Sequence, residues 1–286
     1  MTAEVFAPAK INLTLHVTGQ RPDGYHLLDS LVVFADFGDR LSVAPADSLG
    51  LTVSGPLARG VPVDGRNTVL RAAALLRARR GVAAGAALTL EKRLPHGAGI
   101  GGGSSDAAAA IRLLARHWNV PPLTPTEALE LGADVPVCLF APAPMFMRGI
   151  GDLVVPAPRL PVCWLVLVNP GIEVSTAKVF ALHDRLYDCA SLPLDPAQGF
   201  GDFDGFLAWL LGQRNDLTKV ARDASLAPVV GDVLGALRAL PGCHDADMSG
   251  SGSTCWGLFR HEADARRAAN RLGAAHPDWW IRLSRL

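Results

Sequence analysis

Residues 95–106 of this 286-residue chain form a glycine-rich segment that ends in two serines and an aspartate. Five of the seven residues from Gly97 to Gly103 are glycines, so the backbone can adopt positive φ angles and approach a ligand without Cβ clashes. Successive amide groups can then point at one anion, and the positive end of a following helix would attract it further. The segment predicts a phosphate-binding loop, either of an enzyme that uses a nucleoside triphosphate or of a dinucleotide-binding protein; a merely flexible loop is the alternative.

Three known classes of glycine loop fit this segment poorly. The glycine spacing matches the GxGxxG fingerprint of dinucleotide-binding folds, but the acidic strand end expected about 20 residues later is replaced by Trp118–Thr126, which holds three prolines and no acid. A P-loop needs a lysine after the glycines, and a protein kinase needs an HRD segment; the chain has neither. The hydroxyls of Ser104 and Ser105 are suited to binding phosphate or Mg²⁺ where a helix begins, and a structural cap of that helix is the alternative.

One lysine and one asparagine share a face of a predicted strand near the N-terminus. In Pro8–Leu13 they alternate with apolar residues, and alternate side chains of a strand point the same way, so Lys10 and Asn12 are expected to lie together. A position facing solvent is usual for lysine and is the alternative to a place in a site.

A single carboxylate lies among apolar residues in the middle of the chain. Asp134 precedes Cys138–Phe140, which we expect to form a short strand. Burial of an unpaired carboxylate is costly, so Asp134 either caps the following turn or faces a positive charge such as that of Lys10.

A second segment rich in glycine and serine lies near the C-terminus. In Asp247–Thr254, two glycines alternate with serines within a strand-like context. The segment predicts either a simple hairpin turn or a second wall against the phosphates or the acceptor.

The composition favours a folded cytosolic enzyme. Lysine and arginine together number 27, as do aspartate and glutamate, so the chain has no net charge with which to attract nucleic acid or an anionic membrane. The N-terminus shows no secretory signal, and the chargeless stretch Val135–Met147 is too short and too rich in proline to span a membrane. The five cysteines have no CxxC spacing, which favours buried free thiols over disulfides or a zinc site: Cys138, Cys163, Cys189, Cys243 and Cys255.

The hydrophobic pattern predicts a mixture of strands and helices rather than regular βαβ repeats, and hence an α+β fold. At this length we expect two domains, residues 1–156 and 157–286, which meet near the three prolines of residues 156–161. Strands are expected at residues 5–17, 27–43, 87–90, 163–168 and 280–283, and on both sides of the turn between 246 and 259. Helices are expected at residues 67–80, 106–117, 175–186, 203–211, 228–240 and 262–272.

Taken together, Pro8–Asn12, Pro95–Ser105 and Ser249–Gly252 resemble the three motifs of the GHMP kinases, the superfamily of galactokinase, homoserine kinase and mevalonate kinase. Three further segments are similar to the branch that phosphorylates a cytidine diphosphate conjugate of methylerythritol in the non-mevalonate isoprenoid route: Arg21–His26, Gly132–Pro136 and Asn215–Leu217. The motifs occur in the same order over nearly the whole chain. The chain departs from the family pattern at residues 141–144, where glycines are usual, and at Asp152, where glutamate is usual.

The resemblance implies a two-domain α+β architecture, with an N-terminal ribosomal-protein-S5-like β/α domain, a C-terminal ferredoxin-like α+β domain and an active site in the cleft between them. It also implies that ATP, with Mg²⁺, phosphorylates the tertiary 2-hydroxyl of the methylerythritol part of the conjugate. Two alternatives are another small alcohol as acceptor, such as homoserine or mevalonate, and a nucleic-acid-binding module, since the N-terminal fold also occurs in ribosomal proteins. The resemblance implies a small-molecule substrate. The neutral charge and the N-terminal sequence predict a cytoplasmic protein with no nucleic-acid or membrane partner, and the sequence gives no oligomeric state.

The resemblance also assigns roles by position in the motifs. Asp134 would accept or orient the proton of the acceptor hydroxyl, and Lys10 would keep Asp134 ionised and stabilise charge on the transferring group. ATP would bind to Pro95, His96, Gly97, Ala98, Gly99, Ile100, Gly101, Gly102, Gly103, Ser104 and Ser105, with Asn67 and Lys92 on the adenosine side. The acceptor would contact Asn12, Tyr25, His26, Thr176, Phe180, Ser249, Gly250, Ser251 and Gly252. Among these, Tyr25 and Phe180 would sandwich the cytosine and His26 would hydrogen-bond its edge.

Overall fold

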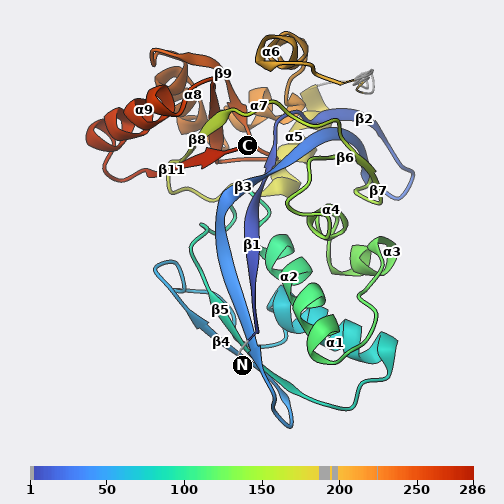
Figure 1. The fold of residues 1–286 in the computed structure, drawn as a ribbon. Helices are drawn as coiled ribbons and strands as arrows, with labels where there is room; N and C mark the ends of the chain where they lie inside the picture. The colour runs from blue at the N-terminus through green and yellow to red at the C-terminus, as the bar shows by residue number, and fades with distance from the viewer. Residues whose placement is uncertain (1–2, 187–193, 195–198, 224) are drawn as a thin grey trace. The chain divides into compact units, whose positions relative to one another are not determined.

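The computed structural model describes residues 3–286 apart from 187–193, 195–198 and 224 (Figure 1). The chain divides into two compact units, each built from several segments. Unit 1 comprises residues 1–10, 37–96 and 101–141, and unit 2 comprises residues 11–36, 97–100 and 142–286. Two long strands, β1 (Ala3–Asn12) and β3 (His26–Ala44), contribute residues to both units. The expected domain boundary at residue 156 stays a prediction.

Unit 1 consists of a small sheet and a group of helices. β4 (Leu49–Ser54) pairs in parallel with β5 (Ala86–Glu91), and β5 pairs antiparallel with Arg40–Ala44 of β3. Helices α1 (Thr68–Arg80) and α2 (Gly102–His117) pack side by side (Figure 1). Both helices bury alanines, and such small side chains allow two helices to approach closely.

The segment after α2 forms short helices where we expected a strand. It contains α3 (Pro125–Ala128), the single turn η1 (Leu129–Leu131) and α4 (Val135–Cys138). The predicted strand Cys138–Phe140 is therefore wrong, because Cys138 ends α4 and the next two residues lie in turns. Pro136 explains the difference: its fixed φ suits the first turn of a helix, whereas a short apolar run does not distinguish a buried strand from a buried helix.

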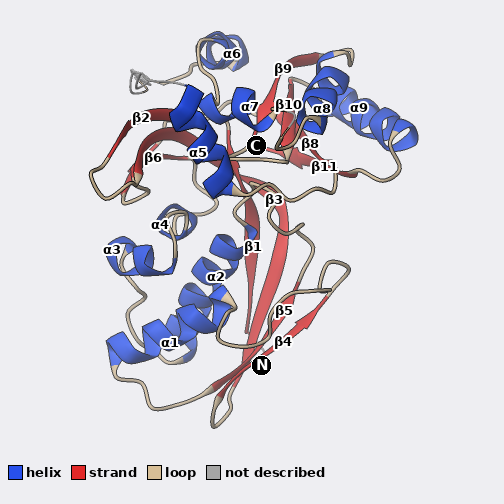
Figure 2. Cartoon of the chain, turned by 180° about the vertical axis from the view of Figure 1, so that it is seen from behind, coloured by secondary structure: helices blue, strands red, loops and turns tan. Residues whose placement is uncertain are grey.

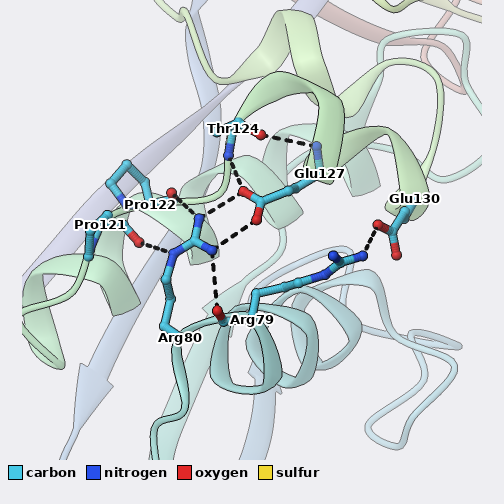
Figure 3. Close-up of polar contacts among 7 residues, drawn as sticks. All are labelled: Arg79, Arg80, Pro121, Pro122, Thr124, Glu127 and Glu130. Carbon is cyan, nitrogen blue, oxygen red and sulfur yellow. Dashed lines mark hydrogen bonds and ion pairs between the residues drawn. The ribbon is translucent and has the colours of Figure 1, made fainter.

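Arg80, at the end of α1, joins that helix to α3 and to the segment before it (Figure 3). Its guanidinium donates to the two carboxylate oxygens of Glu127 at 2.9 and 2.7 Å, and to the carbonyl oxygens of Pro121 at 3.0 Å and Pro122 at 2.8 Å. Glu127 also closes a capping box with Thr124 at the start of α3. The hydrogen bonds from Arg80 lower the pKa of Glu127 to about 2, so the ion pair persists throughout the neutral range.

Arg80→Met is expected to lower the free energy of unfolding by about 1–3 kcal/mol near neutral pH, because Glu127 and two carbonyl groups lose a charged donor. The pKa of Glu127 falls from 4.5 to about 2 on folding. Its stabilisation is therefore complete above pH 4.5 and is lost as the pH falls through about 2. Urea denaturation near pH 7 and near pH 3 measures the effect, and we expect the difference between wild type and variant to shrink at the lower pH.

Arg79→Met is the matched control for this prediction (Figure 3). Arg79 pairs with Glu130 at the surface, where the two side chains are 47% and 50% exposed, against 17% and 20% for Arg80 and Glu127. We expect Arg79→Met to change the free energy of unfolding by less than about 1 kcal/mol. Equal losses in the two variants would contradict the role of Arg80.

Unit 2 is built around a four-stranded antiparallel sheet with the strand order β11-β8-β10-β9. The strands are β8 (Trp164–Asn169), β9 (Cys243–Met248), β10 (Cys255–Phe259) and β11 (Trp280–Arg285). Helices α8 (Val229–Arg238) and α9 (Glu262–Ala275) pack against this sheet (Figure 2). The chain order of strand, helices, two strands, helix and strand is that of a ferredoxin-like fold, as the resemblance implied.

The rest of unit 2 consists of strands from earlier in the chain and of three helices that follow β8. β2 (His16–Gln20), the first part of β3, β6 (Met145–Gly149) and β7 (Leu153–Pro156) pair antiparallel. The helices are α5 (Thr176–Leu186), α6 (Phe203–Leu211) and α7 (Asp216–Ala221). The α+β prediction is confirmed. The strands β4, β6 and β7 and the helices α3, α4 and α7 are additions to the expected elements, and the single strand expected at residues 5–17 is divided into β1 and β2.

No helix among the described residues is long and apolar enough to cross a membrane. Cys138, Cys163 and Cys255 are buried free thiols, as expected, and Cys243 is a partly buried one. Burial raises the pKa of the Cys138 and Cys163 thiols to about 12, which makes them poor nucleophiles. Cys189 lies outside the described residues.

Candidate active site

In unit 1, the side chain of Lys10 on β1 lies against that of Asp134. Lys10 Nζ is 2.9 Å from Asp134 Oδ2, and the two side chains are 3% and 34% exposed. Asp134 takes the N-cap position of α4, but within the described structure its carboxylate makes no capping bond. The geometry thus favours the ion pair over the cap, and Lys10 does not face solvent.

The pair has the properties of a site that handles a hydroxyl proton next to an anionic group. The carboxylate of Asp134 can accept a hydrogen bond or a proton. The ammonium of Lys10 carries three donors, and the bond to Asp134 leaves others for an anionic ligand.

Gly101 allows the glycine loop to pass directly over Lys10. It is the N-cap residue of α2, with φ of 60° in the left-handed region. A Cβ at this position would lie 3.0 Å from the Cβ of Lys10 and 3.3 Å from its Cδ. The close approach of the loop to the lysine therefore requires glycine at this position.

The two serines of the loop lie in the first turn of α2. The Ser105 amide donates to the carbonyl oxygen of Gly101 at 2.8 Å, whereas the amides before it come too early to have a partner within the helix. Ser105 Oγ is buried and has no hydrogen-bond partner among the described residues. Buried hydroxyls nearly always have a partner, so an unpaired one at the positive end of a helix fits a ligand oxygen or a metal ion.

In unit 2, the first part of the glycine loop packs against the turn Ser249–Gly252. Ser249 Oγ donates to the carbonyl oxygen of Gly99 at 2.9 Å, and Thr254 N donates to that of Ala98 at 3.1 Å. A Cβ at Gly99 would collide with the carbonyl oxygen of Ser249 and would lie 2.7 Å from that of Gly252. The two glycine-rich motifs, which are far apart in the sequence, therefore form one structure.

Near Gly102 of the loop, the buried Lys92 lies between two carboxylates of unit 1. Its Nζ contacts Asp39 and is 2.9 Å from Asp106 Oδ2, and all three side chains are buried. Asp39 also accepts bonds from the backbone amides of Arg93 and Leu94, which directly precede the loop. Burial is the largest cause that raises the pKa of Asp106, to about 7, and Asp39 adds to it, whereas Lys92 opposes it.

Asp106→Asn is expected to make the free energy of unfolding less dependent on pH between about 4 and 7. Because the folded pKa lies above the ordinary value of 3.8, Asp106 binds more protons in the folded chain, and the wild type loses stability as the pH rises through this window. Asparagine does not titrate and keeps an oxygen for Lys92. Urea denaturation across the window measures this slope, with the exposed Asp47→Asn as control. Equal slopes for wild type and Asp106→Asn would contradict the assignment.

The other residues assigned to ATP occupy varied surroundings. Asn67 caps α1, since its Oδ1 accepts a bond from Val69 N at 2.9 Å, and its Nδ2 donates to the carbonyl oxygen of Pro62 at 2.7 Å. Ala98 and Ile100 are buried, Pro95 is partly buried, and His96 is exposed. The contacts of Asn67 and Lys92 with adenosine stay predictions.

Asn12 is a buried residue of unit 2 with one free acceptor. Its backbone amide donates to Ser249 Oγ at 3.0 Å, and its Nδ2 donates to Ser30 Oγ at 2.8 Å. The buried indole of Trp256 donates to its carbonyl oxygen at 3.1 Å. Asn12 Oδ1 is buried and has no partner among the described residues, so this atom is available to a donor on a ligand.

The residues assigned to cytosine lie in unit 2 around α5. The ring of His26 stacks on that of Phe180, with centroids 4.3 Å apart, and His26 Nε2 is 2.7 Å from Asp184 Oδ1. Tyr25 is 60% exposed. In this arrangement the imidazole covers one face of Phe180, so a base would stack on the opposite face or replace the imidazole. The sandwich with Tyr25 stays a prediction.

Sequence reasoning missed several residues that hold these groups in place. Asp39 and Asp106 flank Lys92, Asp184 fixes His26, and Trp256 binds the backbone of Asn12. Local sequence gives no sign of these partners, because each lies far from its contact along the chain except Asp106. The acidic residue that directly follows Ser105 was the one available signal.

Known proteins resemble this chain in sequence. Residues 67–142 match the family model described as "GHMP kinases N terminal domain", and residues 197–278 match "GHMP kinases C terminal". The 4-diphosphocytidyl-2-C-methyl-D-erythritol kinase of Jannaschia sp. (strain CCS1) is 56% identical over 276 residues, which cover 96% of this chain and 94% of that protein.

Solved structures resemble it in fold. A crystal structure of 4-(cytidine 5'-diphospho)-2C-methyl-D-erythritol kinase matches with a TM-score of 0.74 and 35% identity, over 98% of each chain. Homoserine kinase from Cytophaga hutchinsonii matches with a TM-score of 0.69 and 17% identity, over 99% of this chain and 94% of that one. The second likeness shows the fold alone.

Proposed function

This chain belongs to the 4-diphosphocytidyl-2-C-methyl-D-erythritol kinases of the GHMP kinase superfamily, and from that premise we propose that it phosphorylates the 2-hydroxyl of 4-diphosphocytidyl-2-C-methyl-D-erythritol with ATP. The new bond joins the acceptor oxygen to the γ-phosphorus, the bond to the β-phosphate oxygen breaks, and ADP leaves. The Lys10–Asp134 pair beneath Gly101 is the observation that supports this most directly, because it combines a cation and a carboxylate beside a phosphate-binding loop.

In this proposal the glycine loop holds the triphosphate through its backbone amides and the N-terminus of α2. Mg²⁺ fits this site. The described residues hold no group of three or more acidic, histidine or cysteine side chains able to bind a metal, and Mg²⁺ bound to a nucleotide is held mostly by phosphate and water. Ser105 Oγ, buried and without a partner in the described structure, would be its protein ligand. When bound, the ion offsets the negative charge of the phosphates.

Lys10 and Asp134 would act on the reacting atoms. Asp134 accepts the proton of the attacking hydroxyl or orients it, and Lys10 stabilises negative charge on the transferring group. Because phosphoryl transfer has a largely dissociative transition state, positioning and charge stabilisation outweigh proton removal. The free acceptor Asn12 Oδ1 would accept a hydrogen bond from a hydroxyl of the substrate.

The cytidine end of the acceptor would bind around α5. Aromatic faces of Tyr25 and Phe180 supply about 1–3 kcal/mol of stacking per base but do not distinguish bases. His26 would distinguish cytosine from other bases. Its Nε2 is bound to Asp184, so its Nδ1 would form the hydrogen bond with the edge of cytosine. Thr176 and Ser251, whose hydroxyls are 2.7 Å apart, would bind the diphosphate.

A parallel acceptor screen tests the proposal. Release of ADP is measured with the cytidine conjugate, homoserine and mevalonate, each with ATP and Mg²⁺. We expect kcat/KM for the conjugate to exceed that for the other two by at least about 10³-fold, since they lack both the base and the diphosphate. A preference for an acceptor without cytidine would overturn the substrate assignment.

The two alternatives are not favoured. Homoserine kinase shares the fold at 17% identity, whereas the cytidine-dependent relative is 56% identical. Tight, salt-dependent RNA binding without ATP turnover would instead favour a nucleic-acid-binding role. Location in the cytoplasm stays a prediction.

A further inference from the structure

Asn215 joins α7 to the turn Ser249–Gly252 within unit 2. It is 3% exposed and is the N-cap residue of α7, where its Oδ1 accepts a bond from Leu217 N at 3.0 Å. Its Nδ2 donates to two carbonyl oxygens of β9 and the turn, those of Met248 at 2.8 Å and Gly250 at 2.7 Å. One amide hydrogen is thus directed at the backbone of the turn that the proposed function assigns to the acceptor, and the other at the end of the strand that leads into it.

The backbone of Asn215 is fixed from two sides. Its amide donates to Asp247 Oδ2 at 2.9 Å, and Thr218 donates to the other oxygen of the same carboxylate at 2.5 Å. On either side of it, Arg214 accepts a bond from Leu15 N at 2.9 Å, and Asp216 N donates to the Leu15 carbonyl at 2.8 Å. Asn215 is therefore a rigid support for whatever its side chain holds.

The side chain of Asn215 fixes the orientation of the peptide group between Gly250 and Ser251. The peptide between Gly250 and Ser251 is trans, and in a trans peptide the C=O and N–H groups point in opposite directions. Because the Gly250 carbonyl points at Asn215, the Ser251 amide points away from it. The described part of the chain provides no acceptor for this amide, although Ser251 itself is 8% exposed.

The other contacts of the turn place this amide beside predicted binding groups. Ser251 Oγ is 2.7 Å from Thr176 Oγ1, the first residue of α5. Ser249 Oγ accepts from Asn12 N and donates to the carbonyl of Gly99. Gly250, with φ of 58°, would allow the peptide to rotate if nothing held it.

We propose that Asn215 is a positioning residue that orients the Gly250–Ser251 peptide so that the Ser251 amide donates to an oxygen of the acceptor's diphosphate. The identity of the ligand rests on the proposed function. The orientation of the peptide rests on the contacts of Asn215 alone.

Asn215→Asp tests the proposal. Aspartate caps a helix as well as asparagine does, so Leu217 N keeps its acceptor, but the second carboxylate oxygen repels the carbonyls of Met248 and Gly250. We expect KM for the cytidine conjugate to rise at least about tenfold, the loss of one hydrogen bond to a charged group, while KM for ATP stays within about twofold. Asn215→Ser, which keeps the cap without the repulsion, is the second variant if the first does not fold.

Val220→Ala is the matched control, because Val220 lies on the same helix, is also buried, and packs in the hydrophobic core of unit 2 without a hydrogen bond to the Asn215 network. It is expected to lower the melting temperature and to leave both KM values unchanged. In the ligand-free protein, the residual dipolar coupling of the Ser251 N–H vector is expected to change in Asn215→Asp and not in Val220→Ala.

Equal changes in both KM values, or an unchanged Ser251 N–H vector in Asn215→Asp, would overturn the proposal. If the wild type does not phosphorylate the cytidine conjugate, the proposed function fails. The dipolar coupling alone then decides whether Asn215 orients the peptide.

Discussion

Asp134→Asn is expected to lower kcat with the cytidine conjugate by about 10²–10⁴-fold while leaving the fold intact. The amide keeps the size of the side chain and can still accept a bond from Lys10 Nζ, now 2.9 Å from Asp134 Oδ2. It has no negative charge and cannot take the proton of the hydroxyl. Steady-state release of ADP with saturating ATP measures the change, and circular dichroism checks the fold.

Glu91→Gln is the matched control for Asp134→Asn. Glu91 is 33% exposed, close to the 34% of Asp134, and is paired with Arg93 on the same unit. Its neutralisation is expected to leave kcat within about twofold, as for a surface ion pair. A kcat for Asp134→Asn within tenfold of the wild type would contradict the role of Asp134.

Lys10→Met is expected to lower kcat by about 10³-fold. Methionine fills the buried path of the lysine stem beneath Gly101 but supplies no cation to the transferring phosphoryl group and none to Asp134. Because Asp134 is partly exposed, water can replace part of the lost interaction, so the variant is expected to fold. Single-turnover measurements with enzyme in excess isolate the chemical step.

The double variant Lys10→Met with Asp134→Asn tests whether the two residues act as a unit. Since each supports the other, the double loss in kcat is expected to be close to the larger single loss and well below the product of both. A loss of kcat in the double variant equal to the product of the two single losses would show that Lys10 and Asp134 act independently. That result would contradict their coupling through the ion pair.

Much of the fold was predictable because its elements carry local signals. The alternation of apolar residues in β5, the spacing of Val69, Ala72 and Leu76 in α1, and the glycines before α2 each depend on neighbours along the chain. The failure at α4 has the same origin, since four apolar residues carry too little periodicity to separate helix from strand.

The site was predictable only in part, for a physical reason. Motif order identified Lys10 and Asp134, but their ion pair joins residues 124 positions apart, and local sequence alone favoured capping for Asp134. The partners of Lys92 and the backbone contacts of Asn215 likewise depend on tertiary packing. Such groups are identified by burial and hydrogen-bond partners, which a single sequence does not give.

Phosphorus-31 NMR of the wild-type protein with ATP, Mg²⁺ and the cytidine conjugate tests the central claim most directly. We expect a new phosphomonoester resonance that grows in step with ADP while the diphosphate resonances of the conjugate stay intact, and we expect its rate of growth to fall by about 10²–10⁴-fold in Asp134→Asn. Formation of ADP with inorganic phosphate and an unchanged conjugate would contradict the claim.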